Sequence, residues 1–168
     1  SFIAFIICEI FIVATGGSLL SLEAALKVIG LLILSVLLAS SMNMLFVLFT
    51  NTLSAFSTLS TIIGTLIGFL AGVYVPMGVL PTFAQNLIML FPISHSSLLL
   101  RDAFMAESIN KVFAGVPIEH IEEYKINFGV MYVMNGSTLD TSTSLVVIIG
   151  SIIIFSIVSI IIFKKKNK

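Results

Sequence analysis

Long stretches without a charged residue constrain this chain more than any other feature of its sequence. Asp, Glu, Lys and Arg are absent between Lys27 and Arg101, and again between Asp140 and Lys164. A charged side chain at the centre of a bilayer costs at least about 2.5–3.5 kcal/mol on insertion scales. The charge-free stretches therefore mark what can lie in lipid, and the chain is predicted to be an all-α integral membrane protein.

The composition supports the lipid bilayer as the solvent of this chain. Hydrophobic residues make up 58% and charged residues 10% of the sequence, whereas soluble domains carry about 25% charged residues. The net charge is zero and no basic patch occurs, so nucleic-acid binding has no support. Cys8 is the single cysteine, which excludes a disulfide within the chain.

Four segments are predicted to be transmembrane helices. A spanning helix needs about 20 apolar residues, and the candidates are residues 1–15, 24–49, 53–75 and 142–163. The first is apolar from Ser1 onward and is broken by Gly16-Gly17. We therefore expect residues 1–168 to form one transmembrane domain that is a fragment, with an N-terminal part missing.

The charges near the C-terminus predict the orientation. Lys and Arg concentrate on the cytoplasmic side of membranes, and residues 164–168 carry four lysines around Asn167. The C-terminus is therefore expected in the cytoplasm, together with the tight turn at residues 50–52. Counting through four helices places residues 76–140 outside the cell membrane.

The proline-rich stretch at residues 76–105 predicts an external re-entrant hairpin. Pro76, Pro81 and Pro92 punctuate a sequence as apolar as a span. A helix between Pro81 and Pro92 would be roughly 16 Å long, about half the hydrocarbon thickness, and a second short helix would follow. The alternative is one irregular transmembrane helix kinked at Pro92, which would place the C-terminus outside.

The stretch from residue 106 to residue 141 is more polar than its surroundings. Pro117 precedes a short amphipathic pattern at residues 118–125, which predicts a helix beginning just after the proline. We expect this stretch to form a small polar external insert.

The order of these parts resembles a known family. Gly72-Val73-Tyr74-Val75-Pro76 is followed by Leu80-Pro81, by Phe91-Pro92, by Arg101-Asp102 and by a last helix that ends in lysines. This order is similar to the C-terminal portion of an ABC type-2 transporter permease. Two features depart from that family's pattern: Arg101 precedes the acidic residue, and the polar insert is longer.

The resemblance implies a function. The four helices would be the third to sixth of a six-helix permease, the transmembrane subunit of a bacterial exporter. A second permease subunit, identical or related, would complete a dimer. A separate cytoplasmic ABC ATPase subunit would hydrolyse ATP with Mg²⁺, so the chain itself would be no enzyme and would bind no cofactor. Consistent with this, the sequence lacks a Walker motif.

Gly64, Gly68 and Gly72 recur every four residues along the third predicted helix. Small residues at this spacing let two helix backbones approach closely in lipid. They predict a contact at the dimer interface or near the transport path, and the alternative is ordinary packing within one subunit.

Two further sets of polar residues lie in predicted spans. Hydroxyl side chains are dense early in the third predicted helix. Two interpretations are open: these side chains line a polar path, or they bond to carbonyl groups of their own helix. The residues are Ser54, Ser57, Thr58, Ser60, Thr61 and Thr65. Glu9 lies in the first span, and an intramembrane carboxylate is by default a functional candidate. Glu9 would otherwise sit near the outer membrane interface.

Arg101 and Asp102 are expected to close the hairpin in an interfacial structural role. His95 and His120 lack partners at ligand spacing, so no metal site and no catalytic residue is predicted. An intramembrane protease would need motifs that are absent. A stand-alone secondary transporter or channel, and a membrane immunity or anchor protein without transport, remain as alternative functions.

Overall fold

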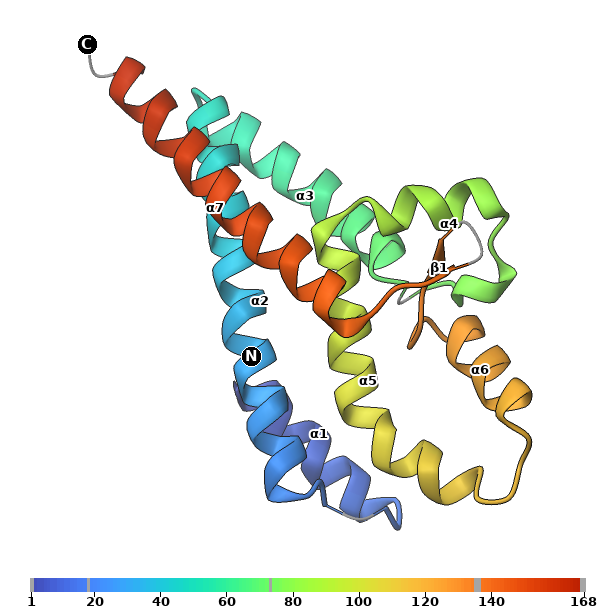
Figure 1. The fold of residues 1–168 in the computed structure, drawn as a ribbon. Coiled ribbons are helices and arrows are strands. Elements are labelled where there is room, and N and C mark those ends of the chain that lie inside the picture. The colour runs from blue at the N-terminus through green and yellow to red at the C-terminus, as the bar shows by residue number, and fades with distance from the viewer. Residues whose placement is uncertain (1, 18, 73, 135–136, 167–168) are drawn as a thin grey trace.

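The computed structural model of the chain is mostly helical (Figure 1). It describes residues 2–17, 19–72, 74–134 and 137–166; Ser1, Val73 of the family-like motif, and the last two residues of the lysine cluster lie outside this description. In chain order the elements are α1 (Phe2–Ala14), α2 (Leu22–Phe49), α3 (Leu53–Leu70), the 3₁₀ turn η1 (Met77–Val79), α4 (Thr82–Met89), α5 (Pro92–Val112), α6 (Ile118–Asn127), β1 (Val133–Met134), β2 (Ser137–Thr138) and α7 (Thr141–Lys166).

Three helices in the described part are long and apolar enough to cross a membrane. They are α2 with 28 residues, α3 with 18 residues and α7 with 26 residues. Helix α1 is equally apolar but has 13 residues, fewer than the about 20 that a span needs. The chain is thus a helical membrane protein, as its charge-free stretches predicted.

Local side chains define where the spanning helices begin. The Ser21 hydroxyl accepts a hydrogen bond from the Ala24 amide at the start of α2, and Thr52 does the same for Ala55 at the start of α3. Such N-caps satisfy amides that have no partner inside the helix. Helix α2 ends at Phe49 and α3 begins at Leu53, which confirms the very tight turn predicted at residues 50–52.

Helix α3 ends at Leu70, five residues before the predicted end at Val75. The backbone of Gly72 adopts φ +63°, a left-handed conformation that suits glycine and ends a helix. The apolar residues that follow do not continue the helix, so the prediction was wrong here.

Helix α2 packs against two other long helices, α5 and α7. Its C-terminal half packs against α7 and its N-terminal half against α5 (Figure 1). Lys166 at the end of α7 donates to the Asn51 side chain at 2.9 Å. We call this end of the bundle, with the α2–α3 turn, the lysine end.

Helix α5 runs antiparallel to α2. Ser96 of α5 contacts Ser35 of α2, and Asp102, later in α5, pairs with Lys27, earlier in α2.

The two helices after Pro81 are unequal, which corrects the prediction of two half-length helices. Helix α4 is short, with 8 residues, but α5 has 21 residues and is about 31 Å long. The two are bent by 93°, the geometry of a broken span or a re-entrant loop. Pro92 does not only end the first helix: it is the first residue of α5, a position that suits a residue without an amide proton.

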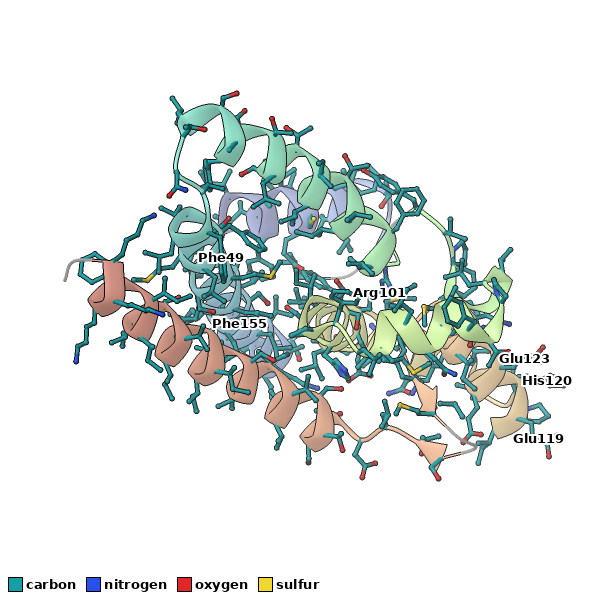
Figure 2. The ribbon with its side chains drawn as sticks, turned by 90° about the horizontal axis from the view of Figure 1, so that it is seen from above. Phe49, Arg101, Glu119, His120, Glu123 and Phe155 are labelled. Carbon is teal, nitrogen blue, oxygen red and sulfur yellow. The ribbon has the colours of Figure 1, made fainter. Side chains whose placement is uncertain are left out.

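The stretch at residues 106–141 begins inside α5 and ends at the first turn of α7. Between them lie α6, whose 10 residues follow Pro117 as predicted, and the two-stranded antiparallel pair of β1 and β2. Figure 2 shows Glu119, His120 and Glu123 on α6 at the edge of the molecule, away from Arg101.

Apolar packing is concentrated where α2, α4, α5 and α7 meet. The buried core there comprises Leu38, Met77, Ile88, Met89, Leu98, Leu99, Tyr132 and Ile148. Helix α3 contributes no buried residue, although Leu70 at its end packs against the core. Helix α3 is therefore the spanning helix least embedded in its own subunit.

Candidate functional site

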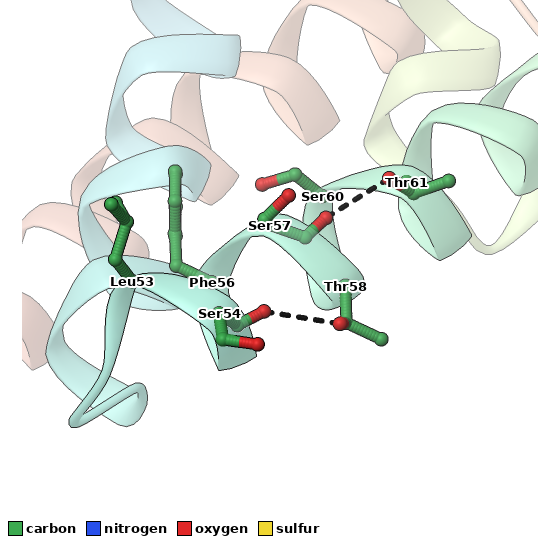
Figure 3. Close-up of a pocket in the computed structure, with 7 residues that line it drawn as sticks. All are labelled: Leu53, Ser54, Phe56, Ser57, Thr58, Ser60 and Thr61. Carbon is green, nitrogen blue, oxygen red and sulfur yellow. Dashed lines mark hydrogen bonds between the residues drawn. The ribbon is translucent and has the colours of Figure 1, made fainter.

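Helix α3 has two chemically different faces. At about 100° of rotation per residue, its small and hydroxyl-bearing residues fall on one half of the helix, which we call the hydroxyl face: Ser54, Ser57, Thr58, Ser60, Thr61, Gly64, Thr65 and Gly68. The other half carries large apolar side chains. Figure 3 shows the part of the hydroxyl face nearest the lysine end, together with Leu53 and Phe56 of the same helix.

Part of the apolar half of α3 packs on the rest of the subunit, whereas Ile62, Leu66 and Phe69 of the same half are exposed. Ile63 and Ile67 line a small apolar cavity together with Met42 and Phe46 of α2 and with Ile93. The hydroxyl face is turned away from this contact, and most of its residues are exposed. Six of the eight residues of this polar half of a spanning helix are thus exposed in the described part of the chain, and Ser60 and Gly68 are half-buried.

The hydroxyl groups on this face fall into two groups. Thr58, Thr61 and Thr65 each donate to the carbonyl oxygen four residues earlier, at 3.0 Å, as one of the two interpretations predicted. Among the described residues, the Ser54 and Ser57 hydroxyls have no such partner. Hydroxyls bonded to their own helix are satisfied, whereas the serines stay available to water or to another helix.

The three candidate glycines occupy different environments. A Cβ atom at Gly64 would meet no atom within 4 Å among the described residues, whereas one at Gly68 would collide with the ring of Tyr74. Gly72 lies beyond the end of α3. The predicted stripe of three glycines on one helix was therefore wrong for Gly72. Gly68 serves packing within the subunit, and Gly64 alone offers a free small surface.

Arg101 and Asp102 are neighbours in sequence but have separate partners. The Arg101 guanidinium donates from Nη2 to the carbonyl oxygens of Ala71 at 2.7 Å and Gly72 at 2.8 Å. Asp102 instead pairs with Lys27 of α2 across 3.5 Å. Both contacts join α5 to a spanning helix, so the pair has a structural role in the fold.

The three candidate prolines mark the boundaries of the elements around the bend. Pro76 precedes η1, Pro81 precedes α4, and Pro92 begins α5. Proline fixes φ near −65° and lacks an amide donor, so each one is suited to the position where a new helix starts.

Glu9 of α1 closes the connection between α1 and α2. Its Oε2 atom accepts a hydrogen bond from the Leu20 amide at 3.3 Å. Its other carboxyl oxygen, Oε1, is buried and has no partner among the described residues. This contact favours a local role for Glu9 in holding the connection between α1 and α2, over a role in a transport path.

We expect Glu9→Gln to change the free energy of unfolding by less than about 1 kcal/mol, because the amide oxygen still accepts from Leu20. Glu9→Leu removes the acceptor and should destabilise the protein more. Circular dichroism of the two variants in detergent checks this order. Equal destabilisation in Glu9→Gln and Glu9→Leu would contradict this local role of the carboxyl oxygen.

A buried polar cluster joins α2, α5 and α7 at the start of α5. His95 is 2% exposed; its Nε2 lies 2.8 Å from the Met89 carbonyl oxygen and its Nδ1 lies 3.0 Å from the Ser144 hydroxyl. A carbonyl only accepts, so Nε2 carries the proton and Nδ1 accepts from Ser144. Ser35 and Ser96 form a second contact beside it.

Tyr132 extends this cluster toward α6. Its hydroxyl donates to the Ser94 carbonyl oxygen at 3.1 Å, and its ring lies edge-on to His95. Burial raises the pKa of the Tyr132 hydroxyl, so the group remains protonated and keeps donating. The sequence analysis missed this cluster. The one signal for it was Ser94-His95-Ser96, three polar residues inside a charge-free stretch.

Comparison of the chain with models of known protein families, with curated proteins and with solved structures finds no match.

Proposed function

We propose that this chain is the membrane-spanning permease subunit of an ATP-binding cassette exporter. In this proposal, the chain and a second permease subunit form the translocation path as a dimer in the bacterial cell membrane. A separate cytoplasmic ABC ATPase drives transport. The proposal rests on the family-like order of motifs and, above all, on the hydroxyl face of α3.

The hydroxyl face carries the proposal because lipid is an unfavourable neighbour for it. A polar group in hydrocarbon without a hydrogen bond costs free energy, so polar faces of membrane helices turn toward protein or water-filled cavities. Small residues also permit close contact between helices. Ser54, Ser57 and Gly64 therefore favour a second subunit or a hydrated path as the neighbour of α3.

The topology that goes with this proposal places the lysine end in the cytoplasm. Lys164, Lys165 and Lys166 all lie in the last turn of α7, and basic residues favour the cytoplasmic side. Helix α1 would then be part of a fourth span. The 93° bend between α4 and α5 would form a re-entrant loop on the external side, with α6 and the β-pair as an external cap.

Recovery of an ATPase tests the proposal. We expect the full-length protein, purified with a tag from its native membranes, to bring down a P-loop ATPase in fixed ratio. An unrelated multi-pass protein with the same tag controls for nonspecific recovery. Repeated purification of an active protein without the ATPase would contradict the proposal and favour a stand-alone transporter. Recovery of a different soluble protein in fixed ratio would favour an anchor or immunity protein.

A further inference from the structure

The Arg101 side chain occupies a site built from two chain segments that each follow a helix. Besides the two bonds to Ala71 and Gly72 after α3, its Nη1 donates to the Phe128 carbonyl oxygen after α6 at 3.4 Å. We call this set of contacts the Arg101 bridge. Carbonyls at helix C-termini lack partners inside the helix and carry partial negative charge, so they favour a cation.

The shape of the site fits a guanidinium. Gly72 and Gly129 border it, and both adopt left-handed backbone conformations, with φ +63° and +67°. A Cβ atom at Gly129 would lie 2.7 Å from Nη1 of Arg101, and one at Gly72 would lie 3.2 Å from the same atom. A side chain at Gly129 would displace the guanidinium, so both the conformation and the space require glycine there.

Among the described residues, the hydrogen-bond partners of Arg101 are backbone carbonyl groups and no acidic side chain. The adjacent carboxylate, Asp102, pairs with Lys27. The Arg101 bridge is thus a set of hydrogen bonds from one guanidinium group to neutral carbonyl oxygens. When these hydrogen bonds break, no second charged group loses its partner.

The two sides of the bridge differ in how firmly they are held. Helix α5 has seven buried residues, among them His95, Leu99 and Ala103, and it packs on both α2 and α7. Helix α3 has no buried residue and is tied at its other end by a short turn. Arg101 therefore joins a fixed helix to the spanning helix that is best able to move.

We propose that Arg101 is a positioning residue that holds the end of α3 against α5, and that release of the Arg101 bridge lets α3 move away from α5 together with its hydroxyl face. The proposal rests on the proposed function, since the hydroxyl face is the candidate path surface. Arg101 acts through the carbonyls of α3 and touches no transported molecule in this scheme.

Distances between spin labels on α3 and α7 test the bridge. Labels at Leu66→Cys and Ile153→Cys, both on exposed positions, are introduced after Cys8→Ser removes the native thiol. The full-length protein is reconstituted with its copurified partners and diluted with unlabelled protein, so that distances within one subunit dominate. We expect one narrow distance distribution for the otherwise unchanged protein.

Arg101→Gln should broaden or shift this distribution, with a width at least about two-fold larger, because the conformation with α3 released becomes populated. Arg101→Lys keeps the positive charge but replaces the planar guanidinium by an ammonium group. We expect this variant to show part of the narrow distance distribution of the otherwise unchanged protein. Lys27→Gln is the matched control, since it breaks the neighbouring contact of α5 without touching α3. An unchanged distribution in Arg101→Gln, or equal broadening in Lys27→Gln, would overturn the proposal.

Nucleotide separates this proposal from the proposed function. ATP with vanadate should shift the unchanged protein toward the distances that Arg101→Gln shows without nucleotide. If nucleotide has no effect while Arg101→Gln still broadens the distribution, the exporter function fails and the positioning role of Arg101 stands. If nucleotide shifts the distances but Arg101→Gln does not, the positioning role fails and the exporter function stands.

Discussion

Gly64→Leu is expected to weaken the association of the chain with the second permease subunit that we propose by about ten-fold or more. Close packing between small-residue faces depends on the absence of a side chain, and a loss of about 1.4 kcal/mol is a factor of ten in affinity. Within its own subunit a Cβ atom at position 64 would meet nothing within 4 Å among the described residues. The substitution therefore starts from open space in its own subunit and tests contacts with another molecule.

The size of the substituent and its position give the controls for this experiment. Gly64→Ala should weaken association less than Gly64→Leu, because a methyl group separates the helices less. Gly150 of α7 also has open space around it, so Gly150→Leu introduces the same side chain on a different spanning helix. The oligomeric state of each variant, extracted from native membranes, is measured by mass photometry.

An unchanged oligomer in Gly64→Leu, with ATPase recovery also intact, would show that the hydroxyl face does not meet a second subunit. Gly68→Leu cannot replace this test, because the new side chain would collide with the Tyr74 ring inside the subunit. A loss of association in that variant would have a local cause. Of the three candidate glycines, Gly64 is therefore the informative position for this test.

The spanning helices could be predicted from the sequence because lipid imposes a simple rule on charge. Helix α2 was expected at residues 24–49 and lies at Leu22–Phe49; α7 was expected at residues 142–163 and lies at Thr141–Lys166. The extra turn of α7 contains lysines, which are good helix formers and need not be in lipid. Charge marks the boundary of the membrane, whereas helix-breaking residues mark the boundary of the helix.

The bend between α4 and α5 could be predicted only in part. Pro92 correctly indicated a break, but proline stops one helix and starts the next equally well. The charged residues from Arg101 onward were interpreted as the end of the helical unit. Arg101 and Asp102 lie instead in the middle of α5, because a helix can continue past the end of an apolar stretch and Arg, Glu and Lys are good helix formers.

The contacts of the candidate site depend on residues distant in sequence, which composition and spacing do not reveal. Arg101 bonds to backbone carbonyls thirty and twenty-nine residues earlier, and a carbonyl has no sequence signature. His95 and Ser144 are 49 residues apart. The hydroxyl face was visible as a list of serines and threonines, but its lack of partners became apparent only once α3 was placed.

His95→Ala should destabilise the protein by about 3 kcal/mol or more. The change leaves the buried Ser144 hydroxyl and the Met89 carbonyl without their partner, at about 1–3 kcal/mol for an unsatisfied group, and adds the cost of a cavity. Because α2, α5 and α7 meet at this cluster, the loss should appear as a lower midpoint of the cooperative unfolding transition, followed by circular dichroism in detergent.

His120→Ala is the matched control, because His120 is exposed on α6 and surface substitutions change stability by less than about 0.5 kcal/mol. His95→Gln supplies a donor and an acceptor and should recover part of the loss. Equal unfolding midpoints for His95→Ala and His120→Ala would contradict a stabilising role for the buried cluster. If His95→Ala is destabilised and His120→Ala is not, the junction of the three helices depends on this polar contact and not on apolar packing alone.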